Sequence, residues 1–245
     1  MYLHHCGVKR IVNALEDRPD IEIIVSEDLP IMESGIKGLP NWQNITYSKN
    51  SPPLGAVPNW NYTLKSAKGE FVWVIHHDEV PNFPHGLDVF LKHLKETNVD
   101  LLMSRLNKDS DNILKRTVRS DLIRRTLLHF PKSILLQNYI GSPSNIIVRR
   151  SRLEDFDQRI QWFVDMEWFF RLIKALKIVE LSQFGITPIP HDKSIKASLG
   201  EKVTEISNLE IEYICSKHQI GGLFRLVWLI KIFLRDNYFR MRASA

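Results

Sequence analysis

Residues 69–79 read Gly-Glu-Phe-Val-Trp-Val-Ile-His-His-Asp-Glu, an apolar run that ends in four adjacent polar side chains. Phe71 to Ile75 is too short for a helix and rich in β-branched and aromatic residues, which favours a central strand of a parallel sheet. In open α/β sheets, ligands bind just beyond the carboxyl ends of strands. The pattern therefore places two imidazoles and two carboxylates, from His76 to Glu79, at such an end. A solvated turn after the strand is the alternative.

The rest of the chain also favours an α/β fold. Short β-rich runs alternate with longer helical patterns, and 245 residues are enough for one compact domain with a substantial core. Helices are expected over residues 1–15, 62–68, 86–97 and 165–176. We divide the chain into one α/β domain over residues 1–205 and a helical, basic tail over residues 206–245.

Composition limits the classes of partner. The net charge is +5 and the isoelectric point about 9.1, which permits nucleic acid, anionic lipid or phosphorylated sugar. No aromatic-interleaved basic stripe accompanies the charge, so we expect no nucleic-acid partner. A basic cluster between residues 105 and 125 is interpreted as a solvated helix face, with recognition of a pyrophosphate or anionic acceptor as the alternative.

Two cysteines, Cys6 and Cys215, are too few for a disulfide scaffold, and charged residues interrupt every apolar run near Met1. We therefore predict a cytoplasmic protein. Residues 223–241 carry apolar side chains at helical spacing with arginine and lysine on the other half of the wheel. That pattern predicts either a peripheral helix on the inner face of the membrane or a terminal helix packed on the domain.

Four more motifs lie elsewhere along the chain. Ile21 to Asp28 is a strand pattern that ends in two acids, and Asn59-Trp60-Asn61 precedes the helical pattern that leads into Gly69. Gly141-Ser142-Pro143-Ser144-Asn145 precedes a strand pattern over residues 146–150, and Val164-Asp165-Met166-Glu167 opens a helical pattern. Together with the stretch at residues 69–79, these motifs resemble the nucleotide-sugar half of family 2 glycosyltransferases over roughly residues 10–175.

The resemblance implies a GT-A fold, a three-layer α/β/α architecture with a mainly parallel central sheet. The corresponding strand in that family ends in Asp-x-Asp or a variant, and His76-His77-Asp78 occupies the motif here. Family members begin with an apolar strand that holds the nucleotide base. Residues 1–15 match the helix that follows this strand. Either the true start lies upstream of Met1, or the chain is a truncated member of the family with a weakened donor site.

The resemblance also implies a site. Asp78 is the expected ligand of a divalent metal, Mn or Mg, which offsets the charge of the departing diphosphate. His191 is a further expected metal ligand, with a surface histidine as the alternative. The donor-binding residues would be Glu27, Asp28, Asn59, Asn61, His76 and His77.

Asp165 matches the position of the general base that takes the proton of the acceptor hydroxyl. An acid that merely stabilises a helix N-terminus is the alternative. Glu167 points roughly away from Asp165 on a helix and is the next candidate. The acceptor side would consist of Gly141, Ser142, Pro143, Ser144 and Glu167.

The expected function is transfer of a sugar from a nucleotide-sugar donor to a hydroxyl acceptor, a saccharide or lipid-linked glycan, with inversion at the anomeric carbon. The alternative belongs to another class. A chain without the first strand could be a non-catalytic protein, derived from a truncated transferase, that binds sugars or a partner.

Overall fold

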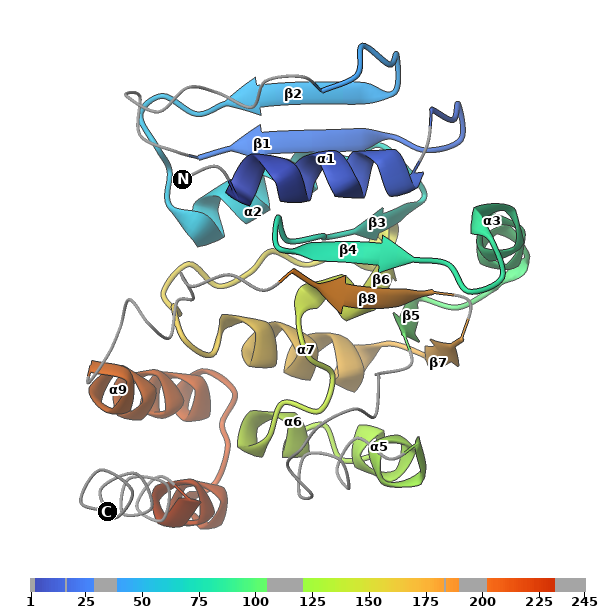
Figure 1. The fold of residues 1–245 in the computed structure, drawn as a ribbon. Helices are drawn as coiled ribbons and strands as arrows, with labels where there is room; N and C mark the ends of the chain where they lie inside the picture. The colour runs from blue at the N-terminus through green and yellow to red at the C-terminus, as the bar shows by residue number, and fades with distance from the viewer. Residues whose placement is uncertain are drawn as a thin grey trace, which may run out of the picture.

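The computed structural model describes residues 3–15, 17–28, 39–104, 121–182, 184–189 and 202–231. Helices and short strands alternate along the chain, as the sequence predicts (Figure 1). The strands are β1 (Ile23–Glu27), β2 (Ile45–Lys49), β3 (Phe71–Trp73), β4 (Glu79–Asn82), β5 (Leu101–Ser104), β6 (Ile146–Arg149), β7 (Ile178–Leu181) and β8 (Gly185–Pro188). The helices are α1 (Leu3–Leu15), α2 (Ala56–Ser66), α3 (Leu87–Glu96), α5 (Asp121–Leu128), α6 (Ser133–Leu136), α7 (Val164–Ala175) and α9 (Lys202–Lys217), with short 3-10 turns η1 (Pro143–Asn145) and η2 (Arg150–Arg152).

The central sheet has four strands in the order β3-β6-β5-β7. β5 and β7 are parallel, whereas β6 is antiparallel to both of its neighbours, β3 and β5. β1 and β2 form a separate parallel pair, and β4 and β8 form an antiparallel pair that lies in front of the central sheet in Figure 1. Among the described residues, no strand precedes α1.

Packing on both faces of the sheet explains the continuous apolar runs of β5 and β6. Leu101 and Met103 belong to the larger core, with α7 and α9, whereas Leu102 points the other way and packs with α3. β6 alternates in the same manner between Ile146 and Ile147. A sheet covered on both faces requires buried side chains at every position, so this is the expected three-layer α/β/α arrangement.

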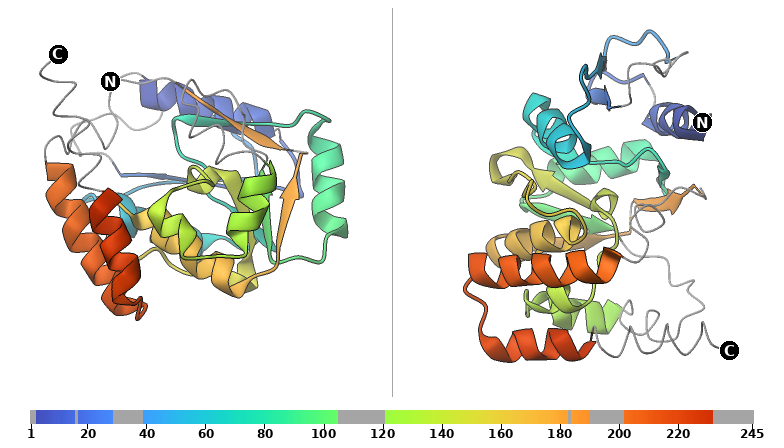
Figure 2. Two further views of the ribbon diagram at one scale, coloured as in Figure 1. Left: turned by 90° about the horizontal axis from the view of Figure 1, so that it is seen from below. Right: turned by 90° about the vertical axis from the view of Figure 1, so that its left-hand side faces the viewer.

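Helices α1 and α2 cover opposite sides of β1, as the right-hand view of Figure 2 shows. The apolar face of α1 packs on β1 through Ile11, Val12 and Leu15. At Gly7, an added Cβ would lie 1.8 Å from the main-chain oxygen of His77. Only glycine permits this approach, so Gly7 lets α1 sit directly against the turn that follows β3.

Some expected boundaries were wrong. α2 begins at Ala56, not at residue 62, so Asn59, Trp60 and Asn61 lie on the helix. Pro58 lies in its first turn, where the missing N–H costs no hydrogen bond. β3 ends at Trp73, two residues earlier than expected.

The expected tail contributes to the core. Ile211, Ile214 and Cys215 of α9 are buried in the larger core, and a helix over residues 222–231 buries Trp228 against Phe163 at a ring distance of 4.9 Å. The division at residue 205 stays a prediction, and it falls inside α9. No helix in the described part of the chain is long and apolar enough to cross a membrane. His191 and most of the basic cluster at residues 105–125 lie outside the described residues.

Candidate active site

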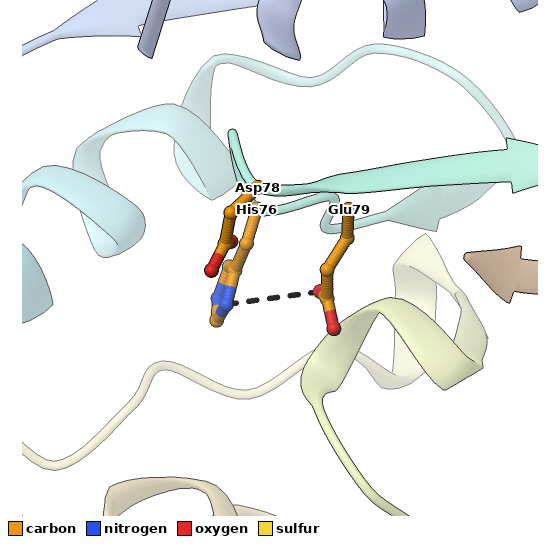
Figure 3. Close-up of side chains that lie close together, drawn as sticks. All are labelled: His76, Asp78 and Glu79. Carbon is orange, nitrogen blue, oxygen red and sulfur yellow. Dashed lines mark ion pairs between the residues drawn. The ribbon is translucent and has the colours of Figure 1, made fainter. Parts of the chain in front are cut away.

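The turn after β3 brings three possible metal ligands together. His76, Asp78 and Glu79 each offer an atom, and these atoms all lie within 4.8 Å of one another (Figure 3). The Nδ1 atom of His76 is 3.9 Å from Oε2 of Glu79. Trp60 of α2 stacks on the His76 ring at a centroid distance of 5.0 Å. The imidazole is therefore stacked on an aromatic ring, and a carboxylate lies near its Nδ1 atom.

The Gly-Ser-Pro-Ser turn contacts this cluster through Ser144. The Ser144 hydroxyl donates to Oε2 of Glu79 at 2.5 Å and accepts from the main-chain N–H of His76 at 3.1 Å. The indole of Trp73 donates to the main-chain oxygen of Ser144 at 2.7 Å. Since Ser144 is fully buried, it joins the two turns firmly. Gly141, Ser142 and Pro143 lie immediately before it, with Gly141 at a φ of 100°.

Asp165 lies in the first turn of α7, and its Oδ1 atom is buried with no hydrogen-bond partner among the described residues. Burial raises the pKa of Asp165 to about 6, and the nearby charges of His76 and Glu79 act on it in opposite directions. The Nε2 atom of His76 is also buried and unpartnered within the described structure. Three carboxylates and an imidazole therefore share one region.

The cluster has a composition that suits a divalent metal. Carboxylate oxygens are preferred by Mg²⁺, and an imidazole alongside them is compatible with Mn²⁺. Two polar atoms near this region, Oδ1 of Asp165 and Nε2 of His76, lack protein partners in the described residues. His76, Asp78 and Glu79 therefore fit a metal, and Glu79 is a candidate ligand that the sequence interpretation did not assign. His77 is exposed beside them.

The expected donor-binding acids lie at the end of β1. Asp28 accepts hydrogen bonds from the main-chain N–H groups of Leu54 and Gly55, both at 2.7 Å, and from the amide of Asn50 at 2.9 Å. It therefore anchors the loop that enters α2, where Gly55 has a φ of 91°. Glu27 is buried and accepts from the Tyr47 hydroxyl at 2.7 Å.

The two asparagines of α2 lie in different surroundings. Oδ1 of Asn59 accepts from the Ser26 hydroxyl at 2.6 Å and from the Asn50 amide at 2.8 Å, next to Asp28. Asn61 is buried, and its amide exchanges two hydrogen bonds of 2.8 Å with the main chain of Phe156. Asn59 therefore belongs to the hydrogen-bonded group at the end of β1, whereas the side chain of Asn61 holds a loop of the core.

Glu167 is fully buried in an ionic network. Its Oε1 atom lies 2.7 Å from Nζ of Lys217, 2.8 Å from Nε2 of His218 and 3.0 Å from Nε of Arg171. Burial alone would raise the pKa of Glu167, but the hydrogen bond from Lys217, the charge of Arg171 and the hydrogen bond with His218 lower it below its usual value. The structure thus gives Glu167 three basic partners, two of which come from the end of α9 and the residue after it.

Glu210 is a residue that the sequence interpretation missed. Its nearly buried carboxylate accepts hydrogen bonds from the main-chain N–H groups of Gln161, Trp162 and Phe163 at 2.6 to 3.1 Å. These residues lead directly into Asp165. Nothing in the sequence marks Glu210, because an acid on a helix is ordinarily solvated and its partners are main-chain groups far away along the chain.

Comparisons with known proteins agree with this fold. The model of glycosyl transferase family 2 matches residues 6–156. A curated relative, the uncharacterized protein MT1568 of Mycobacterium tuberculosis, is 21% identical over 266 residues, which cover 100% of this chain and 78% of that protein.

Similar solved structures come from TarS of S. aureus. TarS 1-349 in complex with UDP-GlcNAc gives a TM-score of 0.64 at 17% identity, covering 95% of this chain and 70% of that one. Another structure of TarS 1-349 gives 0.58 at 17% identity, covering 91% and 64%. A longer TarS chain is covered over 42% of its length, at a TM-score of 0.55 and 18% identity. This chain therefore spans less than half of that longer protein.

Proposed function

The chain belongs to glycosyl transferase family 2 and has the GT-A α/β fold, and on this basis we propose that it transfers a sugar from a nucleotide-sugar donor to a hydroxyl acceptor with inversion. The main observation behind the proposal is that His76, Asp78 and Glu79 lie near the buried carboxylate of Asp165. The three clustered side chains suit a metal-bound diphosphate, and the Asp165 carboxylate can accept a proton.

Each residue type has a chemical task in this proposal. His76, Asp78 and Glu79 would hold a divalent ion, Mn or Mg, which supplies positive charge against the diphosphate when bound. Ser144 and Trp60 orient Glu79 and His76, respectively, through the contacts described above. Asp28 and Asn59 form the side on which the nucleotide is proposed to lie, with the main-chain loop at residues 50–55 fixed between them.

Asp165 acts as the general base. The acceptor hydroxyl gives its proton to the Asp165 carboxylate while its oxygen bonds to the anomeric carbon, and the bond from that carbon to the diphosphate oxygen breaks with its electron pair on the oxygen. A single displacement of this kind inverts the anomeric centre. With a pKa near 6, Asp165 is mostly ionised at neutral pH, yet it is more basic than an ordinary aspartate.

The proposed donor is a uridine diphosphate sugar, because a structure of similar fold, TarS 1-349, is a complex with UDP-GlcNAc. A hexose or related sugar fits that class. The proposed acceptor is a saccharide or lipid-linked glycan at the inner face of the membrane. An apolar surface on the helix over residues 222–231 supports the membrane position, since Leu223, Leu226 and Ile230 are 78%, 54% and 50% exposed.

The proposal is tested by measuring nucleotide binding and sugar transfer with the same protein. UDP, other nucleoside diphosphates and UDP-GlcNAc are titrated with and without manganese, and sugar transfer is followed with candidate saccharide acceptors. Asp78→Asn should lose most metal-dependent nucleotide binding while its melting temperature changes little. Equal affinity of the wild type and Asp78→Asn for UDP in manganese would contradict the metal assignment. Metal-dependent binding of donors by the wild type with no transfer to any acceptor would favour the non-catalytic binding protein.

A further inference from the structure

The three candidate metal ligands come from a single turn. The main-chain N–H of Glu79 donates to the main-chain oxygen of His76 at 3.0 Å, which closes the turn after β3. His76, Asp78 and Glu79 are the first, third and fourth residues of this turn, and their side chains lie together (Figure 3). The Ser144 hydroxyl holds the turn at its start, through the main-chain N–H of His76. The main-chain N–H of Ile189 holds it further on, by donating to the main-chain oxygen of Asp78 at 2.6 Å. Protein contacts therefore position all three ligands.

The separation of His76 and Glu79 suits a shared ion better than a direct bond. Nδ1 of His76 lies 3.9 Å from Oε2 of Glu79, which exceeds the N···O distance of about 2.7–3.2 Å in a hydrogen bond. Two atoms that each bind one ion at about 2.1 Å can lie up to about 4.2 Å apart. Trp60 stacks on the imidazole with an angle of 24° between the ring planes, which limits rotation of the ring. The two side chains are 22% and 15% exposed, so an ion can reach a cluster that is otherwise shielded.

The cluster lacks the basic partners that surround another enclosed carboxylate of this protein. Glu167 pairs with three basic side chains. In the described part of the chain, by contrast, the only ion-pair partner of Glu79 is His76. The charges that act on Asp165 are those of His76 and Glu79, and neither is a lysine or an arginine. Negative charge in a partly buried site is costly without a counter-charge, and a bound cation relieves that cost.

We propose that this cluster binds a transition-metal ion without the nucleotide, and that His76 makes it prefer Mn²⁺ or Co²⁺ to Mg²⁺. Asp78 and Glu79 attract any divalent cation through their charge. Mg²⁺ takes oxygen ligands and gives up its water reluctantly, whereas an imidazole nitrogen suits transition metals, with affinity rising from Mn²⁺ to Co²⁺. His76 is therefore the ligand that distinguishes among the ions. The inference rests on the proposed metal role of the cluster but not on sugar transfer.

Metal binding to the full 245-residue chain, prepared without a histidine tag, tests the proposal directly. Calorimetric titration with Mn²⁺, Co²⁺ and Mg²⁺ in the absence of nucleotide should show saturable binding of Mn²⁺ and Co²⁺, with Co²⁺ at least tenfold tighter than Mg²⁺. Pulsed electron paramagnetic resonance of the bound Mn²⁺ should show coupling to an imidazole nitrogen. Binding of Mn²⁺ only when UDP is present, or bound Mn²⁺ without a nitrogen ligand, overturns the inference.

His76→Asp keeps a ligand at this position and replaces its nitrogen by oxygen. The variant should lower the ratio of Co²⁺ affinity to Mg²⁺ affinity at least tenfold and remove the nitrogen coupling. His129→Asp is the matched control, because His129 is exposed and lies outside the cluster, and its metal affinities should equal those of the wild type. An unchanged ratio in His76→Asp contradicts selection by His76. The wild-type titrations decide the inference even if His76→Asp does not fold.

The same measurements separate this inference from the proposed function. A chain that binds Mn²⁺ only together with UDP, and still transfers sugar, keeps the proposed function and rejects the inference. A chain that binds Mn²⁺ through His76 without UDP, but transfers no sugar to any acceptor, keeps the inference and rejects the proposed function.

Discussion

Asp165, the proposed general base, occupies a position that lowers the stability of the fold. Its carboxylate is held in a site where burial disfavours the charge, and no described residue donates to Oδ1. The raised pKa means that the folded protein binds a proton more readily than the unfolded chain. Stability is therefore lowered above about pH 6 and the penalty disappears as the pH falls below the usual aspartate range near 4.

Asp165→Asn should consequently abolish transfer and stabilise the fold. Removing the ionised group relieves a pKa shift of about two units, which corresponds to at most about 3 kcal/mol at pH 7. Urea denaturation without metal should show this gain at pH 7 and a smaller one at pH 4.5. Transfer within a few-fold of the wild type would show that the base lies elsewhere, and Glu167, enclosed by three basic groups, is then the residue to test.

At the scale of elements, α9 determines the position of the segment before α7. The Glu210 carboxylate accepts hydrogen bonds from the main-chain N–H groups of residues 161–163. These N–H groups precede α7, so no carbonyl of an earlier helical turn is available to accept from them. Asp165 lies only two residues after Phe163. Loss of this anchor would displace Asp165, the proposed base, and we therefore propose that Glu210 is a positioning residue.

Glu210→Gln should lower kcat more than it changes KM and should cost about 1–3 kcal/mol of folding stability, because a buried charged acceptor of several hydrogen bonds is weakened. Glu212→Gln is the matched control on the same helix. The Glu212 side chain is 44% exposed and pairs with Arg225, so its loss should cost below about 1 kcal/mol. Steady-state kinetics and denaturation of both variants make the comparison, and equal effects of the two would argue against anchoring.

The helix over residues 222–231 has two different faces. Trp228 is buried against the domain, whereas Leu223, Leu226 and Ile230 are exposed. Exposed apolar side chains beside basic residues suit an interfacial helix on an anionic membrane. The packed-helix and membrane interpretations are therefore compatible, since they use opposite faces.

The double variant Leu226→Glu, Ile230→Glu should reduce flotation with anionic liposomes several-fold at low salt while leaving the melting temperature nearly unchanged. Leu209→Glu is the control, because Leu209 is 65% exposed on α9 and lies outside this helix. Full flotation of the double variant, or no flotation of the wild type, would contradict membrane binding through this helix.

At the scale of the whole molecule, one lysine connects three parts of the chain. Lys217 of α9 lies 2.8 Å from Asp157 and 2.7 Å from Glu167 of α7. Burial alone would raise the pKa of Asp157, but hydrogen bonds from Lys217 and Tyr213 lower it below its usual value. Carboxylates with lowered pKa stabilise the fold above their ordinary pKa near 4, and this contribution is lost as the pH falls further.

Lys217→Met should therefore cost about 2 kcal/mol at pH 7 and less at pH 3, where the two carboxyl groups are mostly protonated in the unfolded chain. Lys95→Met is the control, since Lys95 is 65% exposed in its pair with Asp20 and should contribute below about 1 kcal/mol. Denaturant titrations at both pH values provide the measurement. A cost that does not change with pH would indicate lost packing instead of lost charge pairing.

Local patterns predicted much of this protein. The apolar run at residues 71–75, the acidic end of β1 and the opening of α7 were sufficient to predict the α/β class, and the order of the motifs identified the family, which the match over residues 6–156 confirms. These features are readable because apolar periodicity and the residues that follow a strand depend on near neighbours. The roles of Asp78, Asp165 and the donor-side residues stay predictions.

Long-range contacts decided the rest. The antiparallel direction of β6, the burial of Asn61 against Phe156 and the anchoring of residues 161–163 by Glu210 all join segments far apart in the chain. Sequence determines which residues are strand-forming, apolar or ionisable. Only tertiary packing decides which edges pair, which carboxylates lose water and which helix reaches a given turn, because those free energies arise from burial and from partners that no local pattern specifies.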